Sequence, residues 1–314
     1  MKNRIILKSQ FSIPMTLYYS VADHIFALTR REPERVPPVS LNFAPFRIDY
    51  PSSEPLFEMV LDQEVVPRSD APTQIFDYDL EDGDCTLCIY DDEYRLTLRS
   101  RGKEATVVCP FARSNYRFGP TCRFYTDMYF DGRSANGIIY DHALVFAYSF
   151  ATLPCKTLLI HSSVIVRGGA AVMCLGESGT GKSTHTRLWL ENIEGTERLN
   201  DDGPVVRVMN DGSVRVYGSP WSGKGCVWKQ EWQPVAAFLR LSQGPANVIK
   251  ELSKFGAFGA LLPSTLPTLQ KEERTLDQIC ATLSDILTTT KAYHLSCLPD
   301  AAAAELSCST ILGE

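Results

Sequence analysis

Residues 170–184 of the chain read AAVMCLGESGTGKST. The first six residues form a short apolar run, which predicts a buried strand, and the next eight fit G-x-x-x-x-G-K-[ST] at every specified position. Residues 182–191 are helix-like, so the loop has the strand-to-helix context that this motif requires. The four specified positions should coincide by accident in roughly one chain of this length per hundred. The segment therefore predicts a phosphate-binding P-loop, rather than a chance glycine-rich turn.

The motif also predicts the cofactors, ATP and Mg²⁺. Its glycines allow backbone N–H groups to turn inward and cradle phosphate oxygens. Lys182 should reach the β- and γ-phosphates, and the Ser183 hydroxyl should bind Mg²⁺. The predicted nucleotide-binding residues are Gly176, Glu177, Ser178, Gly179, Thr180, Gly181, Lys182, Ser183 and Thr184.

A hairpin directly before the loop is predicted to bring a histidine to it. Gly168-Gly169 is a two-residue turn signal between strand-like segments, so Arg167 should pair with Ala170. Counting back along this register, His161 falls opposite Gly176. An imidazole at that position could ligate a metal or donate a hydrogen bond to phosphate. The alternative is a purely structural histidine at the start of a strand.

Two adjacent carboxylates, Asp201 and Asp202, follow a weak strand. A turn at residues 211–212 predicts a second hairpin, whose register places Asp201 near Ser222 and Asp202 near Trp221. Adjacent carboxylates beside a polyphosphate repel each other unless a cation such as Mg²⁺ neutralises them. One of them could otherwise keep a raised pKa and accept a proton from an attacking hydroxyl. The composition also suits an ordinary Asp-Asp-Gly-Pro turn.

A second glycine-containing loop, residues 218–225, is expected at the open end of the second hairpin. Its Lys224 could supply another positive charge to a transferring phosphoryl group. A solvated lysine in a surface loop is the equally simple interpretation.

Length and composition indicate two globular domains. The chain has 314 residues, of which 44% are hydrophobic and 22% charged. Residues 1–140 predict a small, β-rich, antiparallel module of unknown role, with prolines that interrupt any long helix. Residues 141–314 mix strands, hairpins and helices, with helices expected at 141–153, around 276–287 and at 301–311. We expect an α/β (α+β) fold with a mixed sheet, the nucleotide-binding domain following the smaller β-rich one.

The charge balance and the cysteines limit the partners and the compartment. With 31 Lys and Arg against 37 Asp and Glu, the net charge of −6 gives no overall attraction to nucleic acid or to anionic lipid. Residues 111–129 interleave arginines with aromatics, as single-strand binders do, but a β-hairpin is favoured there. No apolar stretch approaches a membrane span. Ten scattered cysteines, with Cys85 and Cys88 on opposite faces of a strand, indicate reduced thiols in the cytoplasm rather than zinc ligands.

Residues 161–224 resemble the HPr kinase/phosphorylase and phosphoenolpyruvate carboxykinase superfamily, in which a histidine, a P-loop and an Asp-Asp pair follow in this order. The matching text is IHSSV from residue 160, GESGTGKST from residue 176 and LNDD from residue 199. The resemblance implies Mg²⁺-ATP at Lys182 and Ser183. It also implies that His161 and Asp202 lie at or near a metal, and Asp201 near the reacting hydroxyl or the metal.

The sequence therefore predicts an ATP-dependent phosphotransferase. By analogy, we expect the acceptor to be a hydroxyl, such as a serine, of a protein, a peptide or a small molecule, and a homo-oligomer is left open. The alternatives are a nucleotide-binding regulatory or accessory module without turnover, and a carboxykinase-like enzyme.

Overall fold

The chain divides into two compact units in a computed structural model. The structure describes residues 15–30, 41–61, 63–80, 82–110, 122–128, 137–223 and 225–313. Unit 1 comprises Met1–Tyr19, Ile25–Val39 and Ile48–Tyr140, and unit 2 comprises Ser20–His24, Ser40–Arg47 and Asp141–Glu314. That the two short N-terminal segments belong with residues 141–314 was not evident from the sequence.

Unit 1 is built on a nine-stranded sheet that is mixed rather than antiparallel. The strand order is β3 (Arg47–Ile48), β1 (Met15–Val21), β2 (His24–Arg30), β4 (Phe57–Leu61), β9 (Cys122–Thr126), β8 (Lys103–Pro110), β7 (Glu93–Ser100), β6 (Gly83–Ile89) and β5 (Gln74–Leu80). The pairs β2–β4 and β4–β9 are parallel. The prediction of an antiparallel module is therefore wrong, because parallel pairing joins segments far apart in sequence and leaves no local turn signal.

The CxxC of unit 1 lies on a strand, as predicted. In β6, Cys85 is buried whereas Cys88 lies on the other face and is partly exposed. All ten cysteines of the chain are free thiols.

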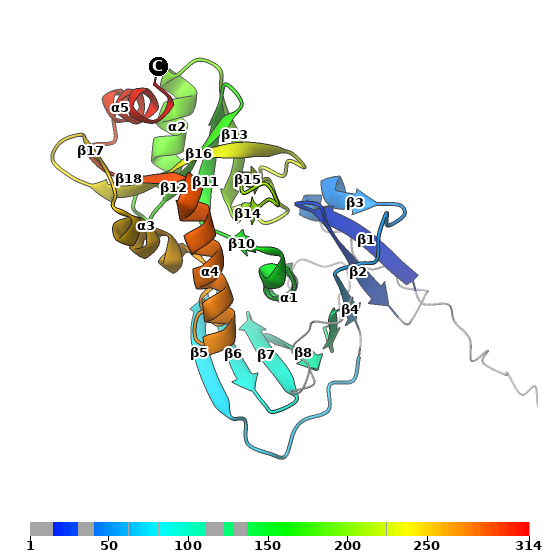
Figure 1. Cartoon of the computed structure of the whole chain (residues 1–314). Coiled ribbons are helices and arrows are strands. Elements are labelled where there is room, and N and C mark those ends of the chain that lie inside the picture. Colours follow the sequence, from blue (N-terminus) through cyan, green and yellow to red (C-terminus); the bar gives the residue numbers. More distant parts are fainter. Residues whose placement is uncertain are drawn as a thin grey trace, which may run out of the picture. The chain divides into compact units, whose positions relative to one another are not determined.

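Unit 2 contains the second mixed sheet, which carries the phosphate loop (Figure 1). Its order is β10 (Thr157–Leu159), β14 (Val205–Val208), β15 (Val214–Tyr217), β16 (Trp232–Gln243), β12 (Ala170–Leu175), β11 (Ser162–Arg167) and β13 (Thr196–Asp202), with β18 (Lys291–Cys297) beside β16 and β17 (Val248–Glu251) beside β18. The strands β12, β16 and β18 are parallel. Two mixed sheets with few helices agree with the predicted α+β class at this general level.

Five α-helices lie among the described residues: α1 (Gly137–Thr152), α2 (Lys182–Asn192), α3 (Lys254–Leu261), α4 (Glu273–Thr289) and α5 (Ala301–Leu312). They include the helices expected from residues 141, 182, 276 and 301. The starts of α4 and α5 are fixed by side-chain caps, since Glu272 accepts from the Thr275 N–H and Asp300 from the Ala303 N–H, both at 2.9 Å. Figure 1 draws α2 and α5 side by side.

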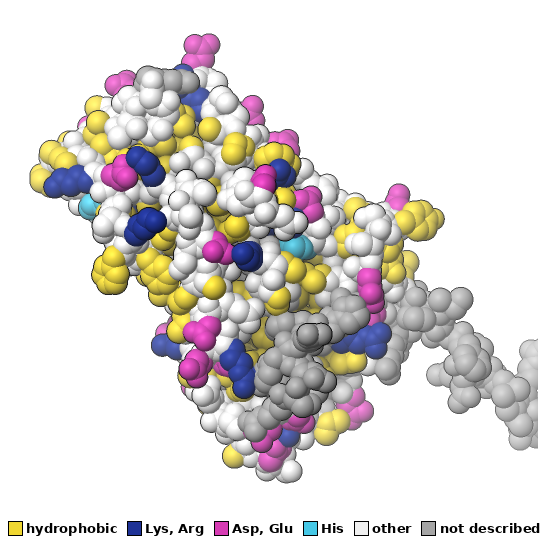
Figure 2. Space-filling view, in the orientation of Figure 1, with side chains coloured by type: hydrophobic (Ala, Val, Ile, Leu, Met, Phe, Trp, Pro, Cys, Tyr) yellow, Lys and Arg dark blue, Asp and Glu magenta, His cyan; other side chains and the backbone are white. Residues whose placement is uncertain are grey.

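Both signs of charge are interspersed over the described part of the face seen in Figure 2. Lys and Arg side chains lie beside Asp and Glu, and apolar side chains separate them. That face therefore has no broad positive area of the kind that nucleic acid requires. The arginine and aromatic residues at 111–121, and Tyr129, lie outside the described residues.

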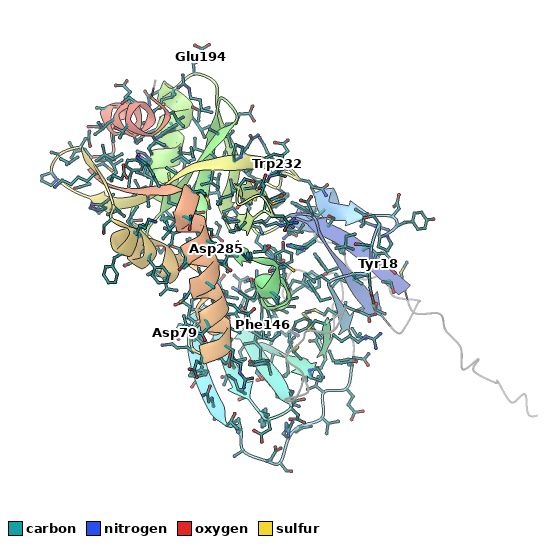
Figure 3. The ribbon with its side chains drawn as sticks, viewed as in Figure 1. Tyr18, Asp79, Phe146, Glu194, Trp232 and Asp285 are labelled. Carbon is teal, nitrogen blue, oxygen red and sulfur yellow. The ribbon has the colours of Figure 1, made fainter. Side chains whose placement is uncertain are left out.

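Charged side chains make two contacts at the surface of unit 2. Trp232, labelled in Figure 3 where β16 begins, lies under the Arg215 guanidinium at 3.9 Å from its ring centroid. Asp285 on α4, also labelled there, forms an ion pair with Lys156 at 2.8 Å. These contacts are exposed and contribute little to stability.

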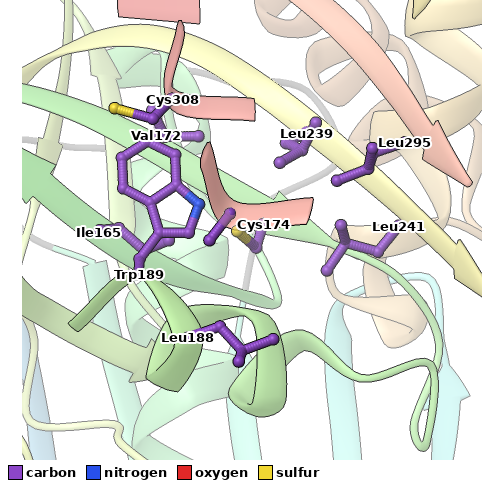
Figure 4. Close-up of a cluster of buried hydrophobic side chains, with 10 residues drawn as sticks. Ile165, Val172, Cys174, Leu188, Trp189, Leu239, Leu241, Leu295 and Cys308 are labelled. Atoms are coloured by element: carbon purple, nitrogen blue, oxygen red, sulfur yellow. The ribbon is translucent and has the colours of Figure 1, made fainter. Parts of the chain in front are cut away.

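The core of unit 2 packs α2 and α5 against one face of the sheet (Figure 4). The cluster consists of Ile165, Val172, Cys174, Leu188, Trp189, Leu239, Leu241, Leu295, Ala304 and Cys308. The Trp189 indole N–H donates to Ser307 Oγ at 2.9 Å, and His185 Nε2 lies 3.1 Å from the same hydroxyl. His185 is thus a buried structural residue.

One helical stretch among the described residues, Gly137–Cys155, has the length and apolar composition of a membrane span. The expectation that no stretch approaches a span is therefore wrong on composition alone. Since 67% of its 18-residue window is buried in the structure, it also has the properties of a core helix, and length is weak support for a span.

Burial of His24 predicts a loss of stability in acid. Its Nε2 lies 2.9 Å from Thr157 Oγ1, and burial, together with the charge of Arg207, lowers its pKa to about 3. An unfolded histidine titrates near 6.5, so the unfolded chain binds the extra proton first. The contribution of the neutral His24 to the free energy of unfolding is fully present above about pH 6.5. It is lost as the pH falls toward 3, by up to about 1.4 kcal/mol per pH unit.

We therefore expect His24→Gln, which can still hydrogen-bond Thr157, to flatten the pH dependence of unfolding. Urea unfolding at pH 7.5 and pH 4.5 should give a wild-type loss about 3 kcal/mol larger than the loss of the variant. Equal losses in the two proteins would contradict a neutral buried imidazole.

Candidate functional site

The predicted phosphate loop, residues 176–181, joins β12 to α2 in unit 2. Gly176, Gly179 and Gly181 have φ of 154°, 81° and 103°, a region that other residues rarely adopt. A side chain at Gly176 would also collide with Thr180, whose Oγ1 lies 2.4 Å from the position of an added Cβ. The backbone conformation thus explains why glycine occupies these positions.

Lys182 folds back over this loop. Its Nζ donates to the carbonyl oxygens of Gly176 at 2.7 Å and Glu177 at 3.2 Å. Burial lowers its pKa, while the negative charges of Asp202 and Asp201 act in the opposite direction. The ammonium group therefore lies within electrostatic range of both carboxylates.

The loop is braced from the neighbouring strand β16. Arg240 forms an ion pair with Glu177 at 3.5 Å, and Gln243 donates a long hydrogen bond of 3.4 Å to the Gly179 carbonyl. Glu177 is itself exposed, so its charge adds little stability. The hydroxyl-bearing Ser183 is exposed in the first turn of α2.

The first hairpin has the predicted register. Arg167 pairs with Ala170 and Ser163 with Cys174, which continues to His161 opposite Gly176. The His161 N–H donates to the Ser264 carbonyl at 2.7 Å, and its side chain is half exposed. Partial burial and the charge of Lys182 lower the pKa of His161, so its imidazole is neutral at neutral pH.

The second hairpin brings the carboxylate pair to the same edge, with a register shifted by one residue. Asp202 lies opposite Ser222 rather than Trp221. The hairpin turn is a three-residue connection, in which Met209 N–H bonds to the Ser213 carbonyl at 2.8 Å and Gly212 takes a φ of 81°. This turn pairs Val205 with Tyr217, a register that alone would place Asp202 opposite Pro220, so the bridge to Ser222 requires two additional residues in the segment after Tyr217. The predicted histidine and the carboxylate pair still lie together, because His161 Nε2 is 3.5 Å from Asp202 Oδ1.

Asp202 has an unusual backbone. Its φ is 128°, in a region that is costly for a residue with a side chain. Such strain is of the order of 1–3 kcal/mol and persists where the surroundings demand that conformation, often at a functional site. The sequence contained no signal of it.

Asp201 has a different environment from its neighbour. Its side chain is only 14% exposed, with Oδ2 3.7 Å from Arg198 Nη1, whereas the Asp202 side chain is 54% exposed. Gly225 allows this approach, because an added Cβ there would meet Arg198 Nη1 at 2.9 Å. Arg198 is a site residue that sequence reasoning missed, although its position three residues before Asp201 could have indicated it.

The glycine-containing loop reaches the carboxylate pair, as expected. Gly223 N–H bonds to the Asp201 carbonyl at 2.5 Å, and Ser222 Oγ donates to the same oxygen at 3.3 Å. Lys224 itself lies outside the described residues, so its predicted role stays a prediction.

A second histidine reaches this site from α1. Burial lowers the pKa of His142, and the negative charge of Asp202 partly offsets the effect. Next to it, burial raises the pKa of Asp141 to about 6, and Asn42 Nδ2 bridges Asp141 at 3.3 Å and the Pro220 carbonyl at 3.1 Å. These residues could not be identified from the sequence, since Asn42 lies far from Asp141 and Pro220 in the chain.

The residues present are compatible with a magnesium nucleotide. No three His, Cys, Asp or Glu side chains among the described residues form a metal-binding group by themselves. Mg²⁺ in nucleotide sites commonly uses one or two protein carboxylates and completes its shell with phosphate oxygens and water. The positive-φ glycines supply the loop conformation that such a site needs. Lys182 and the adjacent carboxylates supply its charges.

Comparison with known proteins adds no assignment. No protein-family model matches the chain, and no curated protein matches it significantly.

Proposed function

We propose that the protein is an ATP-dependent phosphotransferase, related to HPr kinases, that acts on a hydroxyl group. The observation that carries this proposal is the convergence of three features at one sheet edge. They are a positive-φ glycine loop, its lysine, and His161 paired with Asp202, whose negative charge acts on Lys182. Phosphoryl transfer needs mainly positioning and electrostatic stabilisation, which these groups can provide.

Each residue has a defined role in this proposal. Amides of the loop and Lys182 bind the β- and γ-phosphates, and Ser183 and Asp202 hold Mg²⁺. His161, with its neutral imidazole, hydrogen-bonds a phosphate oxygen or the metal's water. Asp201, oriented by Arg198, positions the acceptor hydroxyl. When bound, ATP would supply the phosphoryl group, and Mg²⁺ would offset the negative charges of the carboxylate pair and the phosphates.

The acceptor is a serine hydroxyl or a similar alcohol in a protein, a peptide or a small molecule. The ten free cysteines support a reducing compartment such as the cytoplasm. We propose no nucleic-acid partner, since the net charge of −6 gives no overall attraction to a polyanion.

Turnover of Mg²⁺-ATP by the full chain tests the proposal. We expect the protein to form ADP slowly with water as acceptor and faster when serine or seryl peptides are added, with labelled γ-phosphate recovered on the hydroxyl. Chelation of Mg²⁺ should abolish both reactions. Nucleotide binding without phosphoryl transfer to any alcohol would contradict it.

A second candidate is a nucleotide-binding module without turnover. The Arg198–Asp201 ion pair favours it, because an arginine already compensates one carboxylate. Asp201→Asn discriminates between the two: a kinase should lose turnover while ATP still binds, whereas a module should bind ATP unchanged and have no turnover to lose. Oxaloacetate-dependent consumption of ATP would instead indicate carboxykinase chemistry.

A further inference from the structure

A cavity of about 390 Å³ adjoins the phosphate loop within unit 2. Four segments line it: the loop itself, the first turns of α2, the end of β16 and the residues after β18. The lining residues from these segments include Gly179, Thr184, Leu188, Leu241, Gln243 and Leu298. Its volume falls within the range of about 300–1,000 Å³ that is typical of small-molecule sites.

The order of the strands places this cavity on the opposite side of the loop from the reactive residues. The loop leaves the end of β12, which pairs with β11 on one side and β16 on the other. His161 and Asp202 come from the β11 and β13 side, and the cavity walls come from the ends of β16 and β18. A nucleotide whose triphosphate lies in the loop, with its γ-phosphate toward His161, therefore extends its other end into the cavity.

The lining suits an uncharged, partly apolar group. It contains no Asp, Glu, Lys or Arg, and its histidine, His185, is neutral because burial lowers its pKa to about 4. Leu188, Leu241 and Leu298 provide apolar walls. The carboxamide of Gln243 carries both a donor and an acceptor, and only a long bond of 3.4 Å holds it to Gly179.

We infer that this cavity binds the nucleoside of the nucleotide, with adenine rather than guanine as its base. A carboxamide can pair with the amino group and a ring nitrogen of adenine. The Watson–Crick edge of guanine presents two N–H donors that a carboxylate satisfies best, and no carboxylate lines the cavity. The inference rests on the proposed nucleotide binding. It adds the position of the base and the residues that select adenine.

Calorimetry with two probes measures the affinity of the loop alone and the affinity of the loop together with the cavity. Tripolyphosphate measures the loop alone, whereas ATP measures both. We expect the wild-type chain to bind ATP at least about tenfold more tightly than tripolyphosphate and than GTP. Leu298→Ala, which removes a partly exposed apolar wall, should weaken ATP binding about fivefold and leave tripolyphosphate unchanged. The matched control is Leu190→Ala, since Leu190 is 38% exposed, Leu298 is 40% exposed, and Leu190 does not line the cavity.

The outcomes distinguish a failure of the proposed function from a failure of the nucleoside cavity. If neither ATP nor tripolyphosphate binds the wild-type chain, the proposed function fails and this inference fails with it. If both bind with equal affinity, or if Leu298→Ala weakens both equally, the function stands and the nucleoside cavity is wrong. Equal binding of ATP and GTP would overturn the choice of adenine. Thermal unfolding of each variant verifies that it is folded.

Discussion

Replacing Lys182 with alanine should lower phosphoryl transfer by about a thousandfold. In the proposed reaction, the ammonium group is the only cation that the P-loop motif places on the β- and γ-phosphates, and it would offset charge as the γ-phosphoryl group is transferred. Stability should change little, within about 1 kcal/mol, because burial already disfavours the charged amine, as its lowered pKa indicates. The measurement is ATP turnover at saturating Mg²⁺, paired with urea unfolding of the same preparation.

The control is Lys291→Ala. Lys291 belongs to the same unit but lies 62% exposed in an ion pair with Glu251, away from the loop. Its loss should leave turnover unchanged. Retention of more than about a third of the activity by Lys182→Ala would contradict the assignment of the loop as the phosphate site, since no other described residue replaces this contact.

The parts of the site that the sequence predicted are those set by local rules. Glycines at fixed spacing identified the loop, because only they accept its positive φ angles. The Gly168-Gly169 turn fixed the register that puts His161 opposite Gly176, since a two-residue hairpin admits one pairing. In the second hairpin the same rule failed by one residue, because a longer turn with glycine at its last position took its place.

The remaining features depend on contacts between distant segments. The parallel strands of unit 1 and the bridge from Asn42 to Asp141 join parts of the chain that no sequence window compares. Burial of His185 could have been predicted, since Leu188 and Trp189 lie three and four residues later on the same helical face. The strain at Asp202 could not, because nothing in an aspartate's neighbours specifies a positive φ.

Asp202 should show opposite effects on activity and stability. Asp202→Asn removes a negative charge and a proposed Mg²⁺ ligand, so turnover should fall at least about a hundredfold and need more Mg²⁺. Asp202→Gly should lose as much activity but gain about 1 kcal/mol in the free energy of unfolding, because glycine relieves a φ of 128°. The half-exposed pairing with His161 offsets little of this gain. Urea unfolding and turnover at several Mg²⁺ concentrations measure both effects.

The adjacent carboxylate provides the matched comparison for strain. Asp201 has no positive φ, so Asp201→Gly should lower the free energy of unfolding by about 1 kcal/mol through the added freedom of the unfolded chain. Loss of the Arg198 ion pair acts in the same direction. The two glycine variants should therefore shift stability in opposite directions although both lose activity. Destabilisation by Asp202→Gly as well would mean that its backbone is not strained, and that the fold rather than the reaction requires this residue.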